Sequence, residues 1–339
     1  MKSRSVWAIT TCLTVCAAPA AGHHSFAPHY DPENIVTVTG TVTEFQFRNP
    51  HSFVLIEAVN AAGGTDVWTC ETNSASVLRR EGFAPGMLTP GENVTITGAA
   101  ARRDPTGCRV YTVVRADGSR LQLFGGEPSS EAEVDSGPVN ESMFGTWQVI
   151  PGSGTLGADR LVNQHTGPNA FEGQLTAAGR AATARYDQIT DDPALTCTPA
   201  SPWRVWDDPG SLALIERLND RIVIRHEVMD AVREIRMDQD AHPADVSAAP
   251  LGRSIGRLDG NVLTVETIAL STGVFIPHPG IVMSADAELT EQIRFDPATR
   301  RLHVNWQLDD PEFYSSPLVG EFTLEGSDRE LQRYDCVPD

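Results

Sequence analysis

Apolar and polar side chains alternate along most of the chain, and this two-residue period is typical of β-strands with one buried face. The longest single run covers residues 36–47, where Gly40 predicts a bend or a bulge. Only two short stretches, 74–80 and the Ala-rich 174–186, have the composition of helices. The sequence therefore predicts an all-β protein.

The first part of the chain has the element order of a small closed barrel. Strands are predicted at 36–47, 52–59 and 66–72, then the helix at 74–80, then strands at 93–97 and 109–115. Three strands, one helix and two strands is the order of an OB-type barrel. We therefore predict an OB-like domain over residues 23–124.

A second β-barrel is predicted after an acidic segment rich in Gly, Pro and Ser, residues 125–140, which has the composition of a linker. The next domain, 141–339, opens with Gly145-Thr146-Trp147, which is similar to the Gly-x-Trp on the first strand of lipocalin-like barrels. So many strands favour closure into an antiparallel barrel of about eight with one helix. The predicted strands after that first one are 212–217, 221–228, 232–238, 254–258, 261–268, 288–295, 302–308 and 318–324.

The amino-terminal 22 residues have the pattern of a secretory signal. Lys2 and Arg4 precede an apolar stretch, and small residues allow cleavage after Ala20 or after Gly22. The rest of the sequence contains no apolar run long enough to span a membrane. The sequence thus predicts a periplasmic or secreted protein.

Four of the six cysteines remain once such a signal is removed, and an even number in an exported chain predicts disulfides. Pairing within domains gives Cys70 with Cys108 and Cys197 with Cys336. The first pair conflicts with the predicted topology, because the third and fifth strands of an OB barrel are parallel. Cys70 comes late in one and Cys108 early in the other, so we expect either the bridge or the topology to fail.

The overall charge argues against one class of partner. The chain has 26 basic and 45 acidic residues, a formal net charge of −19. Such a surface repels phosphate backbones, so no nucleic-acid partner is expected.

Histidines are concentrated near the predicted mature amino terminus. His23, His24, His29 and His51 lie within thirty residues, and cleavage after Gly22 would make His23 the first residue. A free amino group together with imidazoles is a donor set suited to Cu(II), so His23, His24 and His51 are a candidate copper site. The alternative is that His51 belongs to a turn and the terminal pair has no metal.

Several spaced motifs of the first domain resemble a family of exported bacterial proteins known only as a domain of unknown function. The resemblance covers about the first third of the chain after the signal. It implies export and a small β-barrel, and it implies no activity. The residues that carry it are His23-His24-Ser25-Phe26-Ala27, Tyr30-Asp31, Gly40-Thr41-Val42, Asn49-Pro50-His51, Trp68, Glu71 and the segment 88–98.

Three polar residues share the apolar face of strands in the second domain. His226, Arg233 and Glu291 alternate in step with buried positions, and the facing strand contributes Trp306. Buried charges must pair or line a wet cavity. The leading interpretation is a site for a small, largely apolar molecule, oriented by these residues.

Two alternatives remain open for this group. One is a structural ion pair. The other is a cofactor-free isomerase, lyase or hydrolase with His226 or Glu291 as the base. Ser254 falls within a Gly-x-Ser-x-Gly motif, but a hairpin rather than a helix is predicted after it, so we do not interpret it as a nucleophile.

Overall fold

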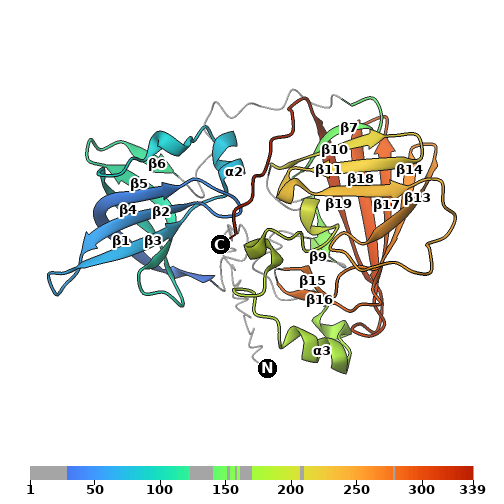
Figure 1. Ribbon diagram of the computed structural model, residues 1–339, viewed down its shortest axis with the longest axis horizontal. Helices are drawn as coiled ribbons and strands as arrows, with labels where there is room; N and C mark the ends of the chain where they lie inside the picture. Colours follow the sequence, from blue (N-terminus) through green and yellow to red (C-terminus); the bar gives the residue numbers. More distant parts are fainter. Residues whose placement is uncertain are drawn as a thin grey trace, which may run out of the picture.

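The protein consists of two closed β-barrels, seen in a computed structural model (Figure 1). The all-β class predicted from the sequence is confirmed. The predicted signal, and the predicted linker apart from Asn140, lie outside the described residues. The structure describes residues 29–122, 140–150, 153–156, 159–160, 170–206, 210–277 and 279–338.

The first barrel has the strand order predicted for an OB fold. Its strands pair in the order β3-β2-β1-β4-β5, and β5 returns to β3 in a parallel pairing that closes the ring. Helix α2 (Ala75–Arg80) begins after Ser74, whose hydroxyl accepts a hydrogen bond from the amide of Val77. The strands are β1 (Tyr30–Gln46), β2 (Phe53–Val59), β3 (Thr65–Glu71), β4 (Asn93–Ala101) and β5 (Gly107–Arg115), with the short β6 (Arg120–Gln122) beside β5 and η1 (Pro85–Met87) before β4.

The expected conflict between the first disulfide and the OB topology does not occur. Cys70 and Cys108 are bonded, with their Cα atoms 4.4 Å apart, and they are direct partners in the parallel β3–β5 pairing. Barrel strands are staggered, so only the end of β3 overlaps the start of β5. A late residue in one strand therefore faces an early residue in the other.

Strand β1 is long and bent, so its first part pairs with β4 and its last part with β2. Its register with β2 shifts between Val42 and Glu44, which marks a bulge. At Gly40 a Cβ atom would lie 2.3 Å from the carbonyl oxygen of Glu57, so only glycine permits this close approach of the two strands. The bend predicted at Gly40 is thus a point of close backbone contact.

The second barrel closes with nine strands, one more than the eight or so predicted. Strand β19 pairs with both β18 and β7, which completes the ring, and all neighbours are antiparallel except β12 and β13. That pair is parallel because segment 237–252 carries the chain back to the same end of the sheet. The strands are β7 (Gly145–Val149), β10 (Leu212–Arg217), β11 (Arg221–His226), β12 (Val232–Arg236), β13 (Arg253–Asp259), β14 (Val262–Ile268), β17 (Glu288–Asp296), β18 (Arg301–Asp309) and β19 (Leu318–Ser327).

Smaller elements lie at one end of the second barrel (Figure 1). Helix α3 (Ala177–Thr183) contacts the hairpin of β15 (Gly273–Ile276) and β16 (Ile281–Met283), which was not predicted from the sequence. None of the described helices is long and apolar enough to cross a bilayer. The other short elements are β8 (Thr155–Leu156), β9 (Asp159–Arg160), η2 (Glu172–Gln174), η3 (Pro193–Thr196), η4 (Arg204–Trp206) and η5 (Val228–Asp230).

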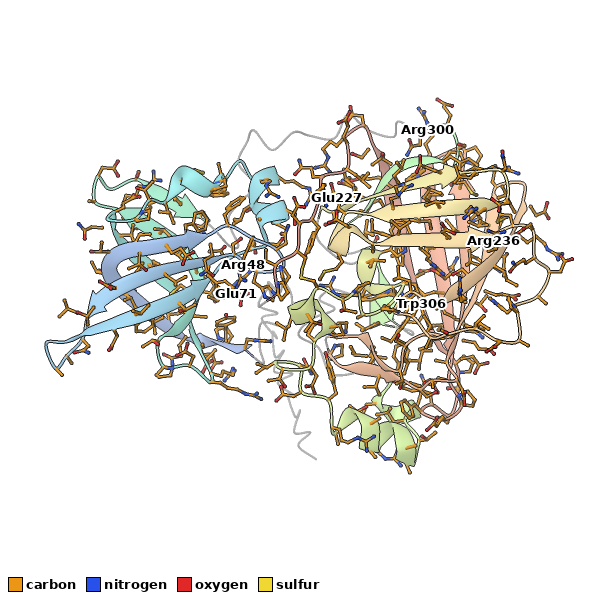
Figure 2. All side chains as sticks on the ribbon, viewed as in Figure 1. Arg48, Glu71, Glu227, Arg236, Arg300 and Trp306 are labelled. Atoms are coloured by element: carbon orange, nitrogen blue, oxygen red, sulfur yellow. A yellow bond between two sulfur atoms is a disulfide. The ribbon has the colours of Figure 1, made fainter. Side chains whose placement is uncertain are left out.

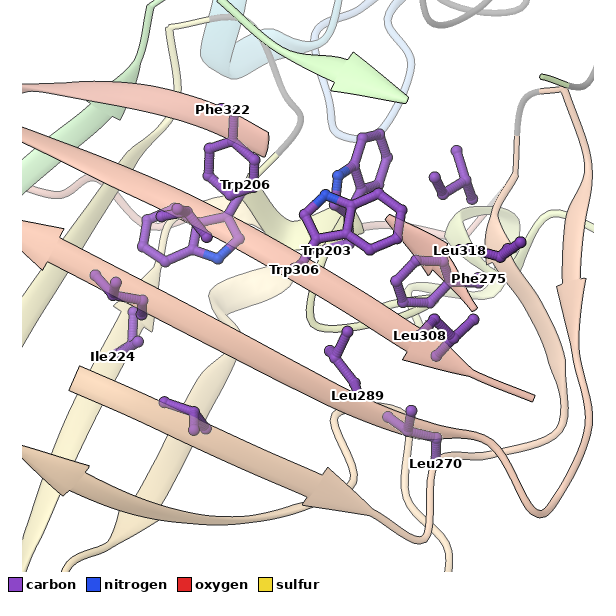
Figure 3. Close-up of a cluster of buried hydrophobic side chains, with 14 of the residues drawn as sticks. Trp203, Trp206, Ile224, Leu270, Phe275, Leu289, Trp306, Leu308, Leu318 and Phe322 are labelled. Atoms are coloured by element: carbon purple, nitrogen blue, oxygen red, sulfur yellow. The ribbon is translucent and has the colours of Figure 1, made fainter. Parts of the chain in front are cut away.

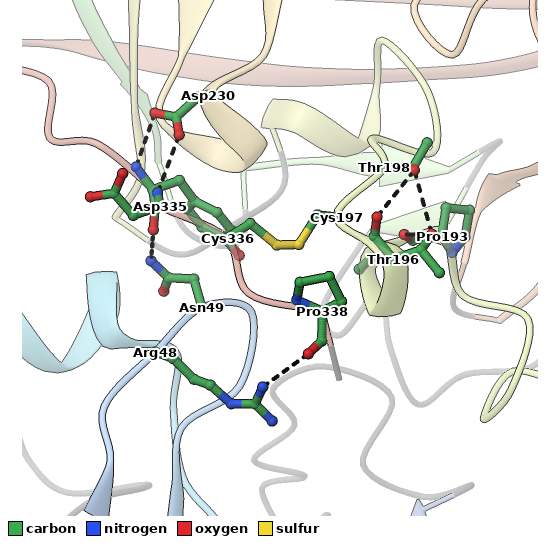
Figure 4. Close-up of a disulfide and its surroundings, with 12 residues drawn as sticks. Arg48, Asn49, Pro193, Thr196, Cys197, Thr198, Asp230, Asp335, Cys336 and Pro338 are labelled. Atoms are coloured by element: carbon green, nitrogen blue, oxygen red, sulfur yellow. Dashed lines mark hydrogen bonds between the residues drawn. A yellow bond between two sulfur atoms is a disulfide. The ribbon is translucent and has the colours of Figure 1, made fainter.

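Residues 328–338, which we call the strap, run from the second barrel to the first (Figure 4). The Asp230 carboxylate accepts hydrogen bonds from the amides of Tyr334 (3.0 Å) and Asp335 (3.2 Å), and Cys336 is bonded to Cys197 as predicted. Beyond the disulfide, the amide of Val337 donates to the carbonyl of Asn49 at 2.8 Å. The Asn-Pro-His segment of the first barrel therefore lies at the contact between the two domains.

An ion pair adds a second contact between the barrels. Arg80 at the end of α2 donates to Glu227, which also accepts hydrogen bonds from the amides of Leu212 (2.9 Å) and Gln332 (2.7 Å). Because the Glu227 side chain is only 2% exposed, this contact is shielded from water.

Candidate ligand-binding site

Six polar or partly polar side chains face the interior of the second barrel, one from each of six successive strands in the ring. We call this set the polar belt. Each of its members is at most 5% exposed. The belt consists of His226 on β11, Arg233 on β12, Ser254 on β13, Thr267 on β14, Glu291 on β17 and Trp306 on β18.

The strand registers bring these side chains together. Ser254 is the direct partner of Thr267, and Glu291 is the direct partner of Trp306. Direct partners across a strand pair point to the same face, so both pairs lie on the inner wall. Alternation with buried aliphatic residues places each member inward, as the sequence predicted for His226, Arg233 and Glu291.

Arg233 is the centre of the belt. Its Nε donates to Ser254 Oγ at 3.1 Å, and its Nη2 donates to Thr267 Oγ1 at 2.7 Å. Nη2 also donates to the Glu291 carboxylate in an ion pair whose two side chains are 2% and 3% exposed. The two hydroxyls of Ser254 and Thr267 are 2.9 Å apart and bond to each other. The pairing of Arg233 with Glu291, one option raised by the sequence, is what the structure shows.

Several buried nitrogen atoms around this centre have no hydrogen-bond partner among the described residues. They are Arg233 Nη1, Trp306 Nε1 and Trp206 Nε1. An unsatisfied buried donor costs about 1 to 3 kcal/mol, and native proteins keep few of them. In this part of the second barrel, buried hydrogen-bond donors thus lack acceptors among the described residues.

His226 is neutral at physiological pH. Burial, and secondarily the charge of Arg233, lower its pKa to about 3, and a hydrogen bond with the backbone of Val205 opposes this shift. The ring packs edge-on against Trp206, with the centroids 4.5 Å apart. A neutral imidazole has one N–H and one lone-pair nitrogen, so with its N–H directed at the Val205 backbone His226 keeps one acceptor.

Aromatic side chains surround the belt. Figure 3 labels Trp203, Trp206 and Trp306 in one buried cluster, with Trp206 beside Phe322 and Trp306 beside Phe275 of the β15–β16 hairpin. The rings of Phe275 and Trp306 meet at a tilt, 5.4 Å between centroids. All of these rings belong to one buried cluster of the second barrel. The environment of the belt is therefore strongly apolar.

A second buried Arg–Glu pair, in the first barrel, has no open donor among the described contacts. Arg109 donates to the Glu71 carboxylate (2.6 Å), to the carbonyl of Thr72 (2.5 Å) and to the side chain of Asn73 (2.7 Å). The Tyr30 hydroxyl donates to the other carboxylate oxygen at 2.6 Å. Figure 2 shows Glu71 on the side of the first barrel that faces the second.

The predicted copper site has no support in the structure. His23 and His24 lie outside the described residues. His51 lies near Glu71: burial alone would raise the pKa of this carboxyl, but the charges of His51 and Arg109 and the hydrogen bond from Tyr30 lower it. In the described part of the chain, no group of three His, Cys, Asp or Glu side chains is placed to hold a metal ion.

Sequence reasoning missed three parts of the site. Thr267 shares the parity of Leu263 and Val265 and could have been found from that alternation. The motif around Ser254 draws attention only to nucleophilic chemistry, and its place within β13 confirms that it is not at a strand-to-helix turn. Trp206 lies on η4, where no period gives its direction.

Fold and site thus define a two-barrel, all-β protein with a polar group enclosed in its second barrel. Residues 11–109 match the family described as "Family of unknown function (DUF6152)", which confirms the resemblance to a domain of unknown function. None of the curated proteins compared with the chain matches it.

Among solved structures, the chain is similar to a mutant of the fluorescent protein UnaG. The two sequences are 10% identical over a match that covers 55% of this chain and 97% of the UnaG chain. The TM-score of the superposition is 0.24. A likeness of this size carries no argument about a ligand, so the function must be inferred from the site itself.

Proposed function

We propose that this is an exported binding protein whose second barrel holds a small, largely apolar molecule, with Arg233, Glu291, His226 and Trp306 at the polar end of that molecule. The observation that carries the proposal is the set of buried nitrogen atoms without partners around Arg233. The surrounding aromatic rings supply contacts for an apolar body. Acceptor atoms on a ligand would satisfy the open donors and offset their cost.

Binding fits the geometry better than acid/base catalysis. A general base needs a free lone pair matched to the working pH. The Glu291 carboxylate is occupied by Arg233, and a His226 with a pKa of about 3 is a weak base. We therefore propose a binding protein and not an enzyme. A ligand incubated with the protein should be recovered chemically unchanged.

Export is supported by the two disulfides together with the predicted signal. Disulfides persist in oxidising compartments such as the bacterial periplasm or the extracellular space. Mass spectrometry of the protein recovered from the periplasm should show an amino terminus at Ala21 or His23; an intact Met1 would contradict export.

The binding proposal is tested with Nile red, an uncharged dye with an apolar body and a carbonyl group. We expect its fluorescence to rise on binding to the whole protein. Trp306→Phe should weaken this binding roughly tenfold, because the variant keeps an aromatic ring but loses the open N–H. The matched control is Trp147→Phe, since the Trp147 N–H already donates to the carbonyl of Met143 at 2.9 Å.

Two results would contradict the proposal. One is no fluorescence change with the folded wild-type protein. The other is equal loss of binding in the Trp306→Phe and Trp147→Phe variants, because general loosening of the core would then explain both.

A further inference from the structure

We infer that the polar end of the bound molecule is an uncharged carbonyl group, as in a ketone, ester or amide, and not a carboxylate. This inference rests on the proposed binding function and specifies its ligand class. It comes from two properties of the polar belt: which hydrogen-bonding groups are open, and how its charges balance.

The open groups are nearly all donors. The guanidinium Nη1 of Arg233 and the indole nitrogens of Trp206 and Trp306 can only donate. Among the belt's own acceptors, Glu291 Oε2 and both hydroxyls already bond to Arg233 or to each other, while the neutral His226 ring keeps one lone-pair nitrogen. A ligand complements this site by bringing oxygen lone pairs.

The charge in the belt is already balanced. Arg233 and Glu291 contribute one charge of each sign, and His226 is neutral. Within the described part of the second barrel, Arg233 is the one buried cation. A ligand carboxylate would therefore add a negative charge beside Glu291 with no further cation to neutralise it, and an uncompensated buried charge is strongly unfavourable.

An uncharged carbonyl avoids this penalty and still satisfies the donors. Its oxygen has two lone pairs and can accept from Arg233 and an indole together. The body attached to it would lie against the rings of Trp203, Trp206 and Phe275, which are all at most 5% exposed. The site thus selects for an apolar molecule with a neutral acceptor at one end.

The test is competition against bound Nile red by two molecules of matched length, 2-undecanone and decanoate, at neutral pH with the full chain. We expect the ketone to displace the dye at a concentration roughly tenfold lower than the carboxylate. Equal potency, or a more potent carboxylate, overturns the inference. If Nile red itself does not bind, the binding proposal fails instead, because the open donors then hold only water.

The variant Glu291→Gln tests the charge argument directly. It keeps the shape of the side chain but leaves Arg233 without its counter-charge, so the preference should shift toward decanoate. Glu288→Gln, on the same strand with its side chain exposed, is the matched control and should keep the wild-type preference. An unshifted preference in folded Glu291→Gln contradicts the charge argument. If this variant does not fold, the wild-type comparison of ketone and carboxylate decides.

Discussion

The two barrels each contain a buried arginine–glutamate pair, and the two pairs are completed differently. In the first barrel, Arg109 donates to Asn73 and to the Thr72 carbonyl as well as to Glu71, which also accepts from Tyr30. In the second, Arg233 retains an open nitrogen and lies near others. The first arrangement is complete within the chain, whereas the second lacks acceptors. This difference separates a structural ion pair from a candidate site.

The largest expected effect concerns the disulfides, which serve different parts of the molecule. Cys70 and Cys108 are 38 residues apart and join two paired strands, whereas Cys197 and Cys336 are 139 apart and hold the strap. In the chain-entropy model, losing these bonds costs about 4 and about 5 kcal/mol respectively.

Replacing both cysteines of a pair by alanine should therefore affect different regions. Hydrogen–deuterium exchange resolved along the sequence checks this prediction. Loss of Cys70–Cys108 should raise exchange in β3 and β5, and loss of Cys197–Cys336 should raise it in the strap and at residues 49–51. Identical exchange patterns in the two double variants would show that the disulfides do not act locally.

Removing one partner of each buried ion pair tests how much each pair contributes to stability. Glu71→Leu and Glu291→Leu should each cost about 4 kcal/mol, since each strands a buried cation. The double variant Arg233→Met/Glu291→Leu should return to within about 1 kcal/mol of wild type, because an apolar pair can replace a buried ion pair. Ser254 and Thr267 still bond to each other in that variant.

The corresponding double variant Arg109→Met/Glu71→Leu should stay about 2 to 3 kcal/mol less stable, because Tyr30, Asn73 and the Thr72 carbonyl lose their partners. Urea unfolding measures all four variants. If the free energy of unfolding returned to the wild-type value in both double variants, or in neither, the two ion pairs would not differ in the way we describe.

Acid should destabilise the second barrel through His226. Its pKa is about 3 in the folded protein against about 6.5 when unfolded, so the unfolded state binds the proton first as pH falls. Stability should therefore decrease by about 1.4 kcal/mol per pH unit from this group between pH 6 and 4.

Urea midpoints at pH 7, 5.5 and 4.5, followed by tryptophan fluorescence, measure this slope. His226→Phe should flatten it, whereas replacing the partly exposed His303, whose pKa burial lowers less, by Asn should reduce it to a smaller extent. The same slope in His226→Phe as in wild type would mean that other groups cause the acid sensitivity.

The sequence predicted the strands well because alternation reports directly which face is buried. It predicted the inward direction of His226, Arg233 and Glu291 for the same reason. It did not predict the parallel β12–β13 pair, because segment 237–252 has no period and the direction of return depends on the whole barrel. The Cys70–Cys108 bond was expected to conflict with the fold because the sequence does not show how far paired strands are shifted along each other. In the structure the end of β3 lies beside the start of β5.

The strap also affects the order in which the molecule is completed. Residues 328–338 are translated after the strands of both barrels, and Cys197 meets Cys336 only then. Cys70 and Cys108 both lie in the first barrel, so their pairing does not require the second barrel. Each barrel can thus close on its own, and the orientation between them becomes fixed last, through an oxidation that requires an oxidising compartment.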